Sequence, residues 1–178
     1  MEEEMFDTYD MNGNFLGIKP KSFCHSENPG CFHKAVWIWI VSGDGKLLIQ
    51  MRAACKKHQP NKYGAPSAGH VQAGETLLET CVRETKEELG LETKQSDYVF
   101  WGEMCVEKFN EFAETYLLET KAQTTDMILK EDEVAFVKFL TFDEFKEIIY
   151  SDDFCVDHDE YKNWLCEKLE KYLASKQE

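Results

Sequence analysis

Residues 69–91 read GHVQAGETLLETCVRETKEELGL, and this stretch decides the expected fold. Thr76 is followed three residues later by Glu79, a capping box that predicts the start of a helix. Gly90 is a favoured residue just beyond a helix end. The residues that recur at helical spacing between these ends, and so predict one buried face, are Leu78, Cys81, Val82, Thr85 and Leu89. The stretch therefore predicts a loop that leads into a helix over residues 76–89.

Glu84, Glu87 and Glu88 lie at positions i, i+3 and i+4, so the predicted helix carries them together on a second face. Neighbouring like charges destabilise an isolated helix by about 0.2–0.5 kcal/mol per pair. A divalent cation removes this repulsion, and Mg²⁺ prefers carboxylate oxygens combined with the phosphates of a substrate. The alternative interpretation is an acidic face in contact with solvent, because the whole chain is acidic.

The glycines, the arginine and the glutamates of this stretch fall at fixed spacing. The pattern resembles the Nudix box, G-x5-E-x7-R-E-U-x-E-E-x-G-U, where U is a bulky apolar residue. The matching residues are Gly69, Glu75, Arg83, Glu84, Glu87, Glu88, Gly90 and Leu91. Thr85, at the first U position, is the one departure. The resemblance implies a Nudix-type α/β/α sandwich with a central mixed sheet. It also implies a hydrolase of the Nudix or MutT kind, acting on phosphoric anhydrides with Mg²⁺ or Mn²⁺ as cofactor.

Composition narrows the class of protein further. The chain has 178 residues, 43% of them hydrophobic, which suits one domain with a sizeable core. Its net charge of −14 argues against nucleic acid or an anionic membrane as a partner. The odd number of cysteines, without a CxxC pair, predicts a reduced chain in the cytoplasm. We expect no signal peptide, because the acidic start MEEEMFDTYD has no apolar segment. We also expect no membrane-spanning helix.

Alternation and turn residues predict the strands of a single domain over residues 1–178. Residues 5–18 read as a hairpin around Asn12-Gly13, and residues 34–41 as a strand buried on both faces. Further strands are expected at residues 46–52, 98–109, 111–119 and 134–140, with a loop at residues 53–66.

Two more helices are expected in the last third of the chain. Thr141 with Glu144 is a second capping box, which predicts a helix to about residue 150. Asp157 or Asp159 is the expected cap of a C-terminal helix over about residues 159–175. This order of strands and helices predicts an α/β sandwich with a mixed sheet.

Outside the box, residues from about 6 to 140 resemble the isopentenyl-diphosphate isomerases, which are enzymes of the Nudix fold. Residues at the positions of that family's lysine and three histidines are Lys21, His25, His33 and His70. The arginine and lysine that hold the diphosphate correspond to Arg52 and Lys56, and an acidic metal ligand on a middle strand to Glu114. The resemblance implies a second metal site at the three histidines and Glu114, suited to Zn²⁺ or Mn²⁺. The alternative is histidines with an ordinary hydrogen-bonding role.

Two departures from the isomerases concern their chemistry. Phe112 stands where that family has a further acidic ligand, and Ala68 stands where it has its catalytic cysteine. Alanine cannot transfer a proton, so isomerisation would lack one of its two groups. The isomerases also tend to have a degraded Nudix box, whereas the box of this chain is intact. Both differences favour a hydrolase of the isomerase-like branch.

The resemblance assigns roles to the polar residues. The metal would be bound by Glu84, Glu87 and Glu88. Phosphate oxygens would be bound by Lys21, Arg52 and Lys56. The alternative for these three basic residues is ordinary surface charge. The general base is either Glu87 or Glu133, where Glu133 has the alternative of a solvated loop residue. Arg83 is expected to pair with Glu75 or Glu84 and hold the loop.

The sequence leaves three functions to compare. The favoured one is Mg²⁺-dependent hydrolysis of a diphosphate linkage in a nucleoside diphosphate or related small molecule, by water attack on phosphorus. The alternative is an isomerase-like protein that binds isoprenoid diphosphates. The third is a non-catalytic interaction domain, which predicts decay of the carboxylate cluster. The substrate stays open, as does the choice between monomer and homodimer.

Overall fold

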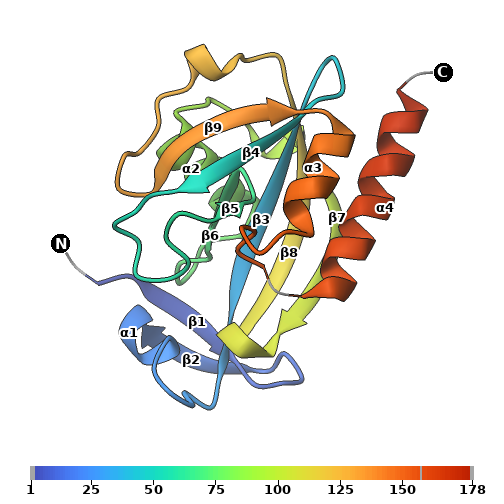
Figure 1. The fold of residues 1–178 in the computed structure, drawn as a ribbon. Coiled ribbons are helices and arrows are strands. Elements are labelled where there is room, and N and C mark those ends of the chain that lie inside the picture. Colours follow the sequence, from blue (N-terminus) through green and yellow to red (C-terminus); the bar gives the residue numbers. More distant parts are fainter. Residues whose placement is uncertain (1–2, 157, 177–178) are drawn as a thin grey trace.

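The computed structural model describes residues 3–156 and 158–176. Figure 1 shows a twisted sheet with α3 and α4 on its near side and α2 behind it. The strands are β1 (Met5–Tyr9), β2 (Phe15–Pro20), β3 (Phe32–Ser42), β4 (Leu47–Arg52), β5 (Tyr63–Gly64), β6 (Ser67–His70), β7 (Tyr98–Val106), β8 (Glu111–Thr120) and β9 (Val134–Leu140). The α-helices are α1 (Lys21–Cys24), α2 (Leu77–Leu89), α3 (Phe142–Ile149) and α4 (Asp159–Ser175). Short 3₁₀ turns lie at Gln95–Asp97, Glu107–Phe109 and Thr124–Asp126.

The long strand β3 is the centre of the sheet. One of its edges pairs with β8 in parallel, from His33 opposite Glu111 to Ser42 opposite Thr120. Its other edge pairs antiparallel with β1, β6 and β4 in turn. β7 extends the sheet beyond β8, while β5 and β9 flank β4. The predicted α/β fold with a mixed sheet is confirmed.

Each face of β3 contributes to a separate hydrophobic core. Trp39 packs with side chains of β4, β8, α3 and α4 on one face. Val36 and Ile38 pack with side chains of α2, including Cys81 and Leu89, on the other. Because each fully buried large apolar side chain contributes about 1.5–3 kcal/mol, these two layers hold the helices against the sheet. The sheet and α2 thereby form a rigid support for the polar residues between them.

The box helix forms as its sequence predicts. The Thr76 side chain accepts from the Glu79 amide and the Glu79 carboxylate accepts from the Thr76 amide, which completes the capping box. Gly90 ends the helix in a left-handed conformation with φ of 70°. Among the helices of the described ranges, none combines the length and the apolarity that a membrane crossing needs.

Local expectations were wrong at three places. Residues 69–70, expected to begin the box loop, instead end strand β6, which pairs with β3 from Ala35 opposite His70 to Ile38 opposite Ser67. The loop expected at residues 53–66 contains β5, which pairs with β4. The N-cap of α4 is His158, whose Nδ1 accepts from the Tyr161 amide at 3.4 Å. Asp159 is the first residue of that helix, and Asp157 lies outside the described residues.

Candidate active site

Arg83 connects the box loop, the box helix and β6. Its Nε and Nη2 donate to the two carboxylate oxygens of Glu75, both at 2.9 Å. Nη1 donates to Glu84 Oε1 at 2.6 Å, and Nη2 also donates to the carbonyl of His70 at 3.0 Å. A bidentate arginine–carboxylate pair fixes orientation as well as distance. Burial opposes both charges, but the pairing raises the pKa of Arg83 and lowers the pKa of Glu75.

Two glycines shape the box loop for different reasons. A Cβ atom at Gly69 would overlap the carboxylate of Glu84, so the absence of a side chain lets Glu84 lie directly against β6. Gly74 has φ of +81°, a left-handed conformation that side chains rarely adopt. The structure shows a close approach of Glu84 at the first and an unusual backbone at the second.

The three box glutamates differ in their exposure. Glu88 is 6% exposed, the Glu84 side chain is 13% exposed, and the Glu87 side chain is 44% exposed. The backbone amide of Ala68 donates to Glu88 Oε2 at 3.0 Å. Burial raises the pKa of Glu84, and burial with the nearby charge of Glu84 raises the pKa of Glu88 to about 8. Glu84 and Glu88 are therefore not part of an acidic face in contact with solvent, whereas Glu87 is partly exposed. Buried carboxylates with raised pKa values fit a site for a hard cation.

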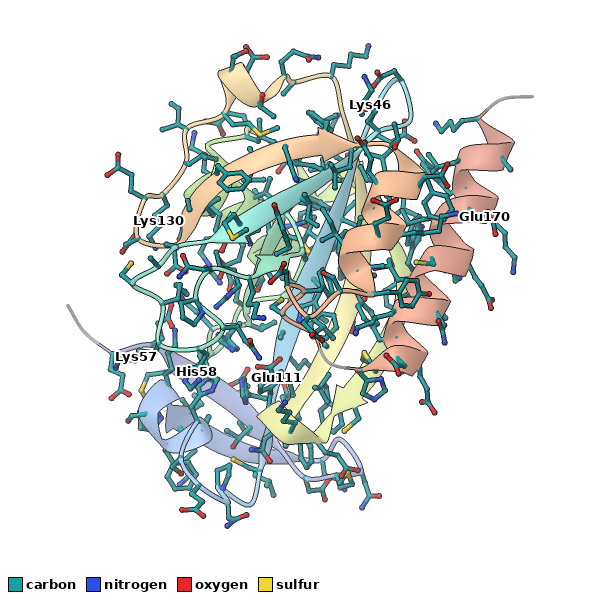
Figure 2. All side chains as sticks on the ribbon, in the orientation of Figure 1. Lys46, Lys57, His58, Glu111, Lys130 and Glu170 are labelled. Carbon is teal, nitrogen blue, oxygen red and sulfur yellow. The ribbon has the colours of Figure 1, made fainter. Side chains whose placement is uncertain are left out.

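The predicted phosphate-binding residues all have protein partners in the structure. Lys56 forms an ion pair with Glu133, and Lys21 Nζ lies 2.5 Å from Glu4 Oε2. Arg52 donates through Nε to the carbonyl of Gln59 at 3.2 Å and through Nη2 to that of His58 at 3.1 Å. Arg52 thus supports the loop after β4 that carries Lys56. Figure 2 shows Lys57 and His58 of this loop at the end of the molecule that holds Glu111, far from Lys46.

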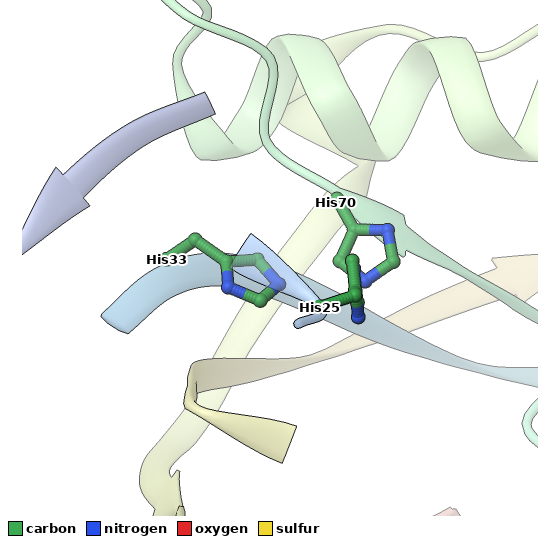
Figure 3. Close-up of side chains that lie close together, drawn as sticks. All are labelled: His25, His33 and His70. Atoms are coloured by element: carbon green, nitrogen blue, oxygen red, sulfur yellow. The ribbon is translucent and has the colours of Figure 1, made fainter. Parts of the chain in front are cut away.

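Three histidines come together from three elements, as the sequence resemblance implied. Figure 3 shows His33 at the start of β3, His70 at the end of β6 and His25 just after α1. One ring nitrogen from each lies within 4.8 Å of the others. His33 is fully buried, and neither of its nitrogens has a hydrogen-bond partner among the described residues. Burial, with His70 nearby, lowers the pKa of His33 to about 4 and also lowers the pKa of His25.

The acidic residue beside these histidines is Glu111, and the structure does not bring Glu114 to them. Glu111 Oε1 lies 3.3 Å from His70 Nε2 and 3.8 Å from His33 Nε2. Glu114 pairs in register with Val36, so it points to the face of β8 that is covered by α2, where the Tyr116 hydroxyl donates to it at 2.5 Å. Strand side chains alternate between faces, which separates these two glutamates. The register of β8 against β3, which places Glu111 opposite His33, decides which of the two glutamates reaches the histidines.

Phe6 of β1 is a second residue that sequence reasoning missed. It is fully buried, and its ring lies 5.1 Å from the ring centroids of His33 and His70. The hairpin also contacts the box loop, since the Ala73 amide donates to the Met5 carbonyl at 2.7 Å. The Gly74 amide donates to Asp7 Oδ2 at 3.2 Å. The N-terminal hairpin therefore contacts both the histidines and the box.

Comparisons with known proteins agree with this geometry. Residues 32–165 match the NUDIX domain family. An uncharacterised Nudix hydrolase of Clostridium acetobutylicum is 33% identical over 154 residues, which cover 81% of this chain and 73% of that protein. An isopentenyl-diphosphate Delta-isomerase of Streptomyces griseus is 36% identical over 90 residues, which cover 51% of this chain and 45% of the isomerase.

The fold comparison extends over nearly the whole chain. A solved structure from Deinococcus radiodurans superposes with a TM-score of 0.70 and 20% identity, covering 94% of this chain and 98% of that one. With the family match over residues 32–165 and the intact box, these similarities establish the family. The chain belongs to the NUDIX family and is a hydrolase of the class that acts on phosphoric anhydrides.

Proposed function

We propose that this protein hydrolyses a diphosphate linkage in a nucleoside diphosphate or a related small molecule, with Mg²⁺ or Mn²⁺ held by Glu84, Glu87 and Glu88. The observation that carries the proposal is the pair of buried carboxylates, Glu84 and Glu88, held in place by Arg83 and by the Ala68 amide. Arg83 offsets part of the repulsion at Glu84 and Glu87, and a divalent cation beside the cluster would offset the rest. The bound ion would polarise the phosphoryl group and neutralise the leaving group.

The residues around the box would hold the diphosphate. Arg52 keeps its loop in place through Nε and Nη2, and we assign its remaining nitrogen, Nη1, to a phosphate oxygen. Lys56 would leave its partner Glu133 to bind phosphate, and Lys21 would leave its partner Glu4 in the same way. Each exchange replaces one ion pair by another, so its net cost is small. Phosphate binding at Lys56 would leave the Glu133 carboxylate without this ion pair.

The general base that takes the proton of the attacking water is Glu87 or Glu133. Glu87 is more exposed than Glu84 and Glu88, and Arg83 Nη1 lies 3.7 Å from its Oε1. Glu133 is ion-paired to Lys56, and its charge acts on Glu88 across the site. A general base acts only after it has lost its proton, so its loss removes the limb of the pH profile at low pH, whereas loss of a metal ligand changes the dependence on metal concentration. Measuring both for Glu87→Gln and Glu133→Gln assigns the two roles.

The test of the proposed function is metal-dependent phosphate release. Glu88→Gln should lower kcat at least about 100-fold while the fold, followed by circular dichroism, is retained. Glu92→Gln is the control, because this exposed glutamate follows the box and pairs with Lys86 on the surface. Unchanged turnover in both Glu87→Gln and Glu88→Gln would contradict the assignment of the box.

The histidines support a second candidate role, a separate metal site. His33 is buried, and within residues 3–156 and 158–176 neither of its nitrogens has a hydrogen-bond partner, which is unusual for a purely structural histidine. With His25 and His70 it offers three nitrogen ligands, and Glu111 rather than Glu114 would be the fourth. Such a mixed nitrogen and oxygen set suits Zn²⁺ or Mn²⁺. Binding of Zn²⁺ measured by calorimetry should be lost in His33→Ala and Glu111→Gln and kept in Glu114→Gln.

The remaining proposals concern the protein as a whole. We propose one domain over residues 1–178, with a small-molecule diphosphate as its substrate and with neither nucleic acid nor membrane as a partner. We place the protein in the cytoplasm, because all the cysteines are free and the net charge is strongly negative. Monomer and homodimer both remain compatible with the fold, and sedimentation distinguishes them.

A further inference from the structure

Two buried side-chain oxygens near the box have no hydrogen-bond partner within residues 3–156 and 158–176. They are Oγ of Ser67 in β6 and Oε1 of Gln50 in β4, and these residues are 0% and 2% exposed. Buried polar atoms are nearly always hydrogen-bonded, because an unpartnered one still carries the cost of leaving water. Both oxygens can therefore accept a hydrogen bond from a molecule that binds beside them.

Both side chains point to the face of the sheet that α2 covers. Ser67 lies opposite Ile38 of β3, and Gln50 lies opposite Val137 of β9. Ile38 and Val137 pack in the core between the sheet and α2, and residues opposite each other on paired strands share a face. The Gln50 side chain also reaches the segment before Ser67, since its Nε2 donates to the Ala65 carbonyl at 2.7 Å. This contact fixes which end of the amide is the donor and leaves Oε1 as the free acceptor.

Glu88 connects these side chains to the box. The amide of Ala68, the residue after Ser67, donates to Glu88 Oε2 at 3.0 Å. Burial and the charge of Glu84 raise the pKa of Glu88, and the Ser67 hydroxyl acts in the opposite direction, as expected for a hydroxyl close to the carboxylate. Ser67 Oγ therefore borders the proposed metal site, although no hydrogen bond to the described residues occupies it.

Water on a divalent ion is the donor that suits these oxygens. Mg²⁺ in proteins is usually held by one or two carboxylates and keeps several of its water molecules. The positive charge makes such water more acidic, so it donates stronger hydrogen bonds than bulk water does. Hydroxyl and amide oxygens accept these bonds without adding a charge to a site that already has three carboxylates. Apolar side chains at the same positions would leave the water hydrogens without acceptors.

We propose that Ser67 Oγ and Gln50 Oε1 accept hydrogen bonds from water molecules on the ion bound at the box, and so act as positioning residues for the metal. The inference rests on the proposed function, since it assumes that Glu84, Glu87 and Glu88 hold a divalent ion. It adds two residues from strands outside the box to the metal site. Replacing residues that orient the ligands of a metal typically lowers metal affinity about 10–100-fold.

Ser67→Ala tests the hydroxyl through metal binding and stability together. Mn²⁺ affinity, measured by electron paramagnetic resonance, should fall about 10-fold. With a chelator present, the variant should melt no lower than wild type, because the hydroxyl has no partner among the described residues. Ser42→Ala is the control with the opposite pattern. Ser42 Oγ accepts from the Lys46 amide at 2.9 Å, so its loss should lower the melting temperature and leave Mn²⁺ affinity unchanged.

Two substitutions at Gln50 separate the roles of its two ends. Gln50→Met removes both the donor to Ala65 and the free acceptor, whereas Gln50→Glu removes the donor and keeps an acceptor at a similar position. Gln50→Met should lower Mn²⁺ affinity about 10-fold, and Gln50→Glu should bind Mn²⁺ at least as tightly as wild type. Equal losses in both variants would mean that Gln50 acts only through its contact with Ala65.

The outcomes separate the two oxygens from the box itself. Three results would overturn the proposal: unchanged Mn²⁺ affinity in Ser67→Ala, a loss of affinity there that comes with a lower melting temperature in chelator, or equal losses in both Gln50 variants. Each of these leaves the proposed function standing, provided that the wild-type protein binds Mn²⁺. If the wild-type protein binds no Mn²⁺, the proposed function fails and this inference fails with it.

Discussion

The backbone amide of Ala68 donates a hydrogen bond of 3.0 Å to the carboxylate of Glu88, and this contact joins the box helix to the edge strand β6. Glu88 is buried at this contact. Its burial and the nearby charge of Glu84 raise the pKa of Glu88 to about 8. The amide alone does not offset the cost of burying the charge. The glutamate therefore has a reason to bind a cation, and the strand that holds it carries His70 two residues later.

The raised pKa predicts how the stability of the metal-free protein depends on pH. The folded state binds the Glu88 proton more tightly than the unfolded state, in which the pKa is near 4.5. Stability should therefore fall as pH rises from about 4.5 to about 8, because the unfolded state loses this proton first. Glu88→Gln removes that loss. In the presence of a chelator it should melt at least roughly 2–4 °C above wild type at pH 8.

The comparison between pH values isolates Glu88 from other effects of the substitution. At pH 4.5 the melting temperatures of wild type and Glu88→Gln should differ much less. Glu87→Gln serves as the control, because the Glu87 side chain is 44% exposed and its charge is hydrated in both states. A melting difference for Glu88→Gln that is independent of pH would contradict the buried, raised-pKa carboxylate.

Gly69→Ala should disable the metal site while the fold is retained. The added Cβ would overlap the Glu84 carboxylate and force it away from β6. We expect Mn²⁺ affinity, measured by electron paramagnetic resonance, to fall about 10–100-fold, as for loss of a residue that orients a metal ligand. Gly43→Ala is the control, since a Cβ there meets nothing within 4 Å and the position has no left-handed φ. Equal Mn²⁺ affinity in both variants would refute the close approach of Glu84.

Arg83→Lys should uncouple the box loop from the helix, although charge is conserved. A lysine ammonium lacks the planar fork of the guanidinium, through which Arg83 reaches Glu75 twice, Glu84 and the His70 carbonyl. A double-mutant cycle of Arg83→Lys with Glu75→Gln should give a coupling free energy of about 1–3 kcal/mol in denaturant unfolding. Additive effects would mean that the bidentate pair contributes little to holding the loop.

Asp7 of the N-terminal hairpin should affect the box through the Gly74 amide, which donates to its carboxylate at 3.2 Å. Asp7→Ala should raise the metal concentration needed for half-maximal activity about threefold to tenfold. Asp7→Asn should bring this concentration most of the way back to the wild-type value, because the side-chain amide oxygen still accepts the hydrogen bond from Gly74. Asp10→Ala is the control. It alters the same hairpin at its turn, where the backbone amides of Asn12 and Asn14 donate to the Asp10 carboxylate. Failure of Asp7→Asn to restore the metal dependence would argue against this contact.

The box helix could be predicted from sequence because its signals are local. The capping box at Thr76 and the stop at Gly90 depend on residues within one or two turns of each other. The edge strand β6 could not, because residues 67–70 become a strand only by pairing with β3, more than 25 residues away in the chain. Strand formation of this kind is decided by tertiary contacts that four residues do not encode.

The site shows the same division between local and long-range signals. The box glutamates followed from spacing, and the three histidines followed from the family resemblance. The presence of Glu111 instead of Glu114 beside the histidines depends on the register of β8 against β3. A slip of one residue in this register would move every side chain of β8 to the other face of the sheet. The partners of Arg52 and Lys56 depend on how the loop after β4 folds back, and composition carries no information on that.

The most direct test of the central claim is hydrolysis in water labelled with heavy oxygen, with Mg²⁺ and a panel of nucleoside diphosphates and triphosphates, nucleotide sugars and isopentenyl diphosphate. Mass spectrometry of the products locates the label. Hydrolysis at the box predicts label in a phosphate product from at least one of these compounds, no product without metal, and loss of the product in Glu88→Gln. Isomerised isopentenyl diphosphate without labelled phosphate from any compound would contradict hydrolysis at the box.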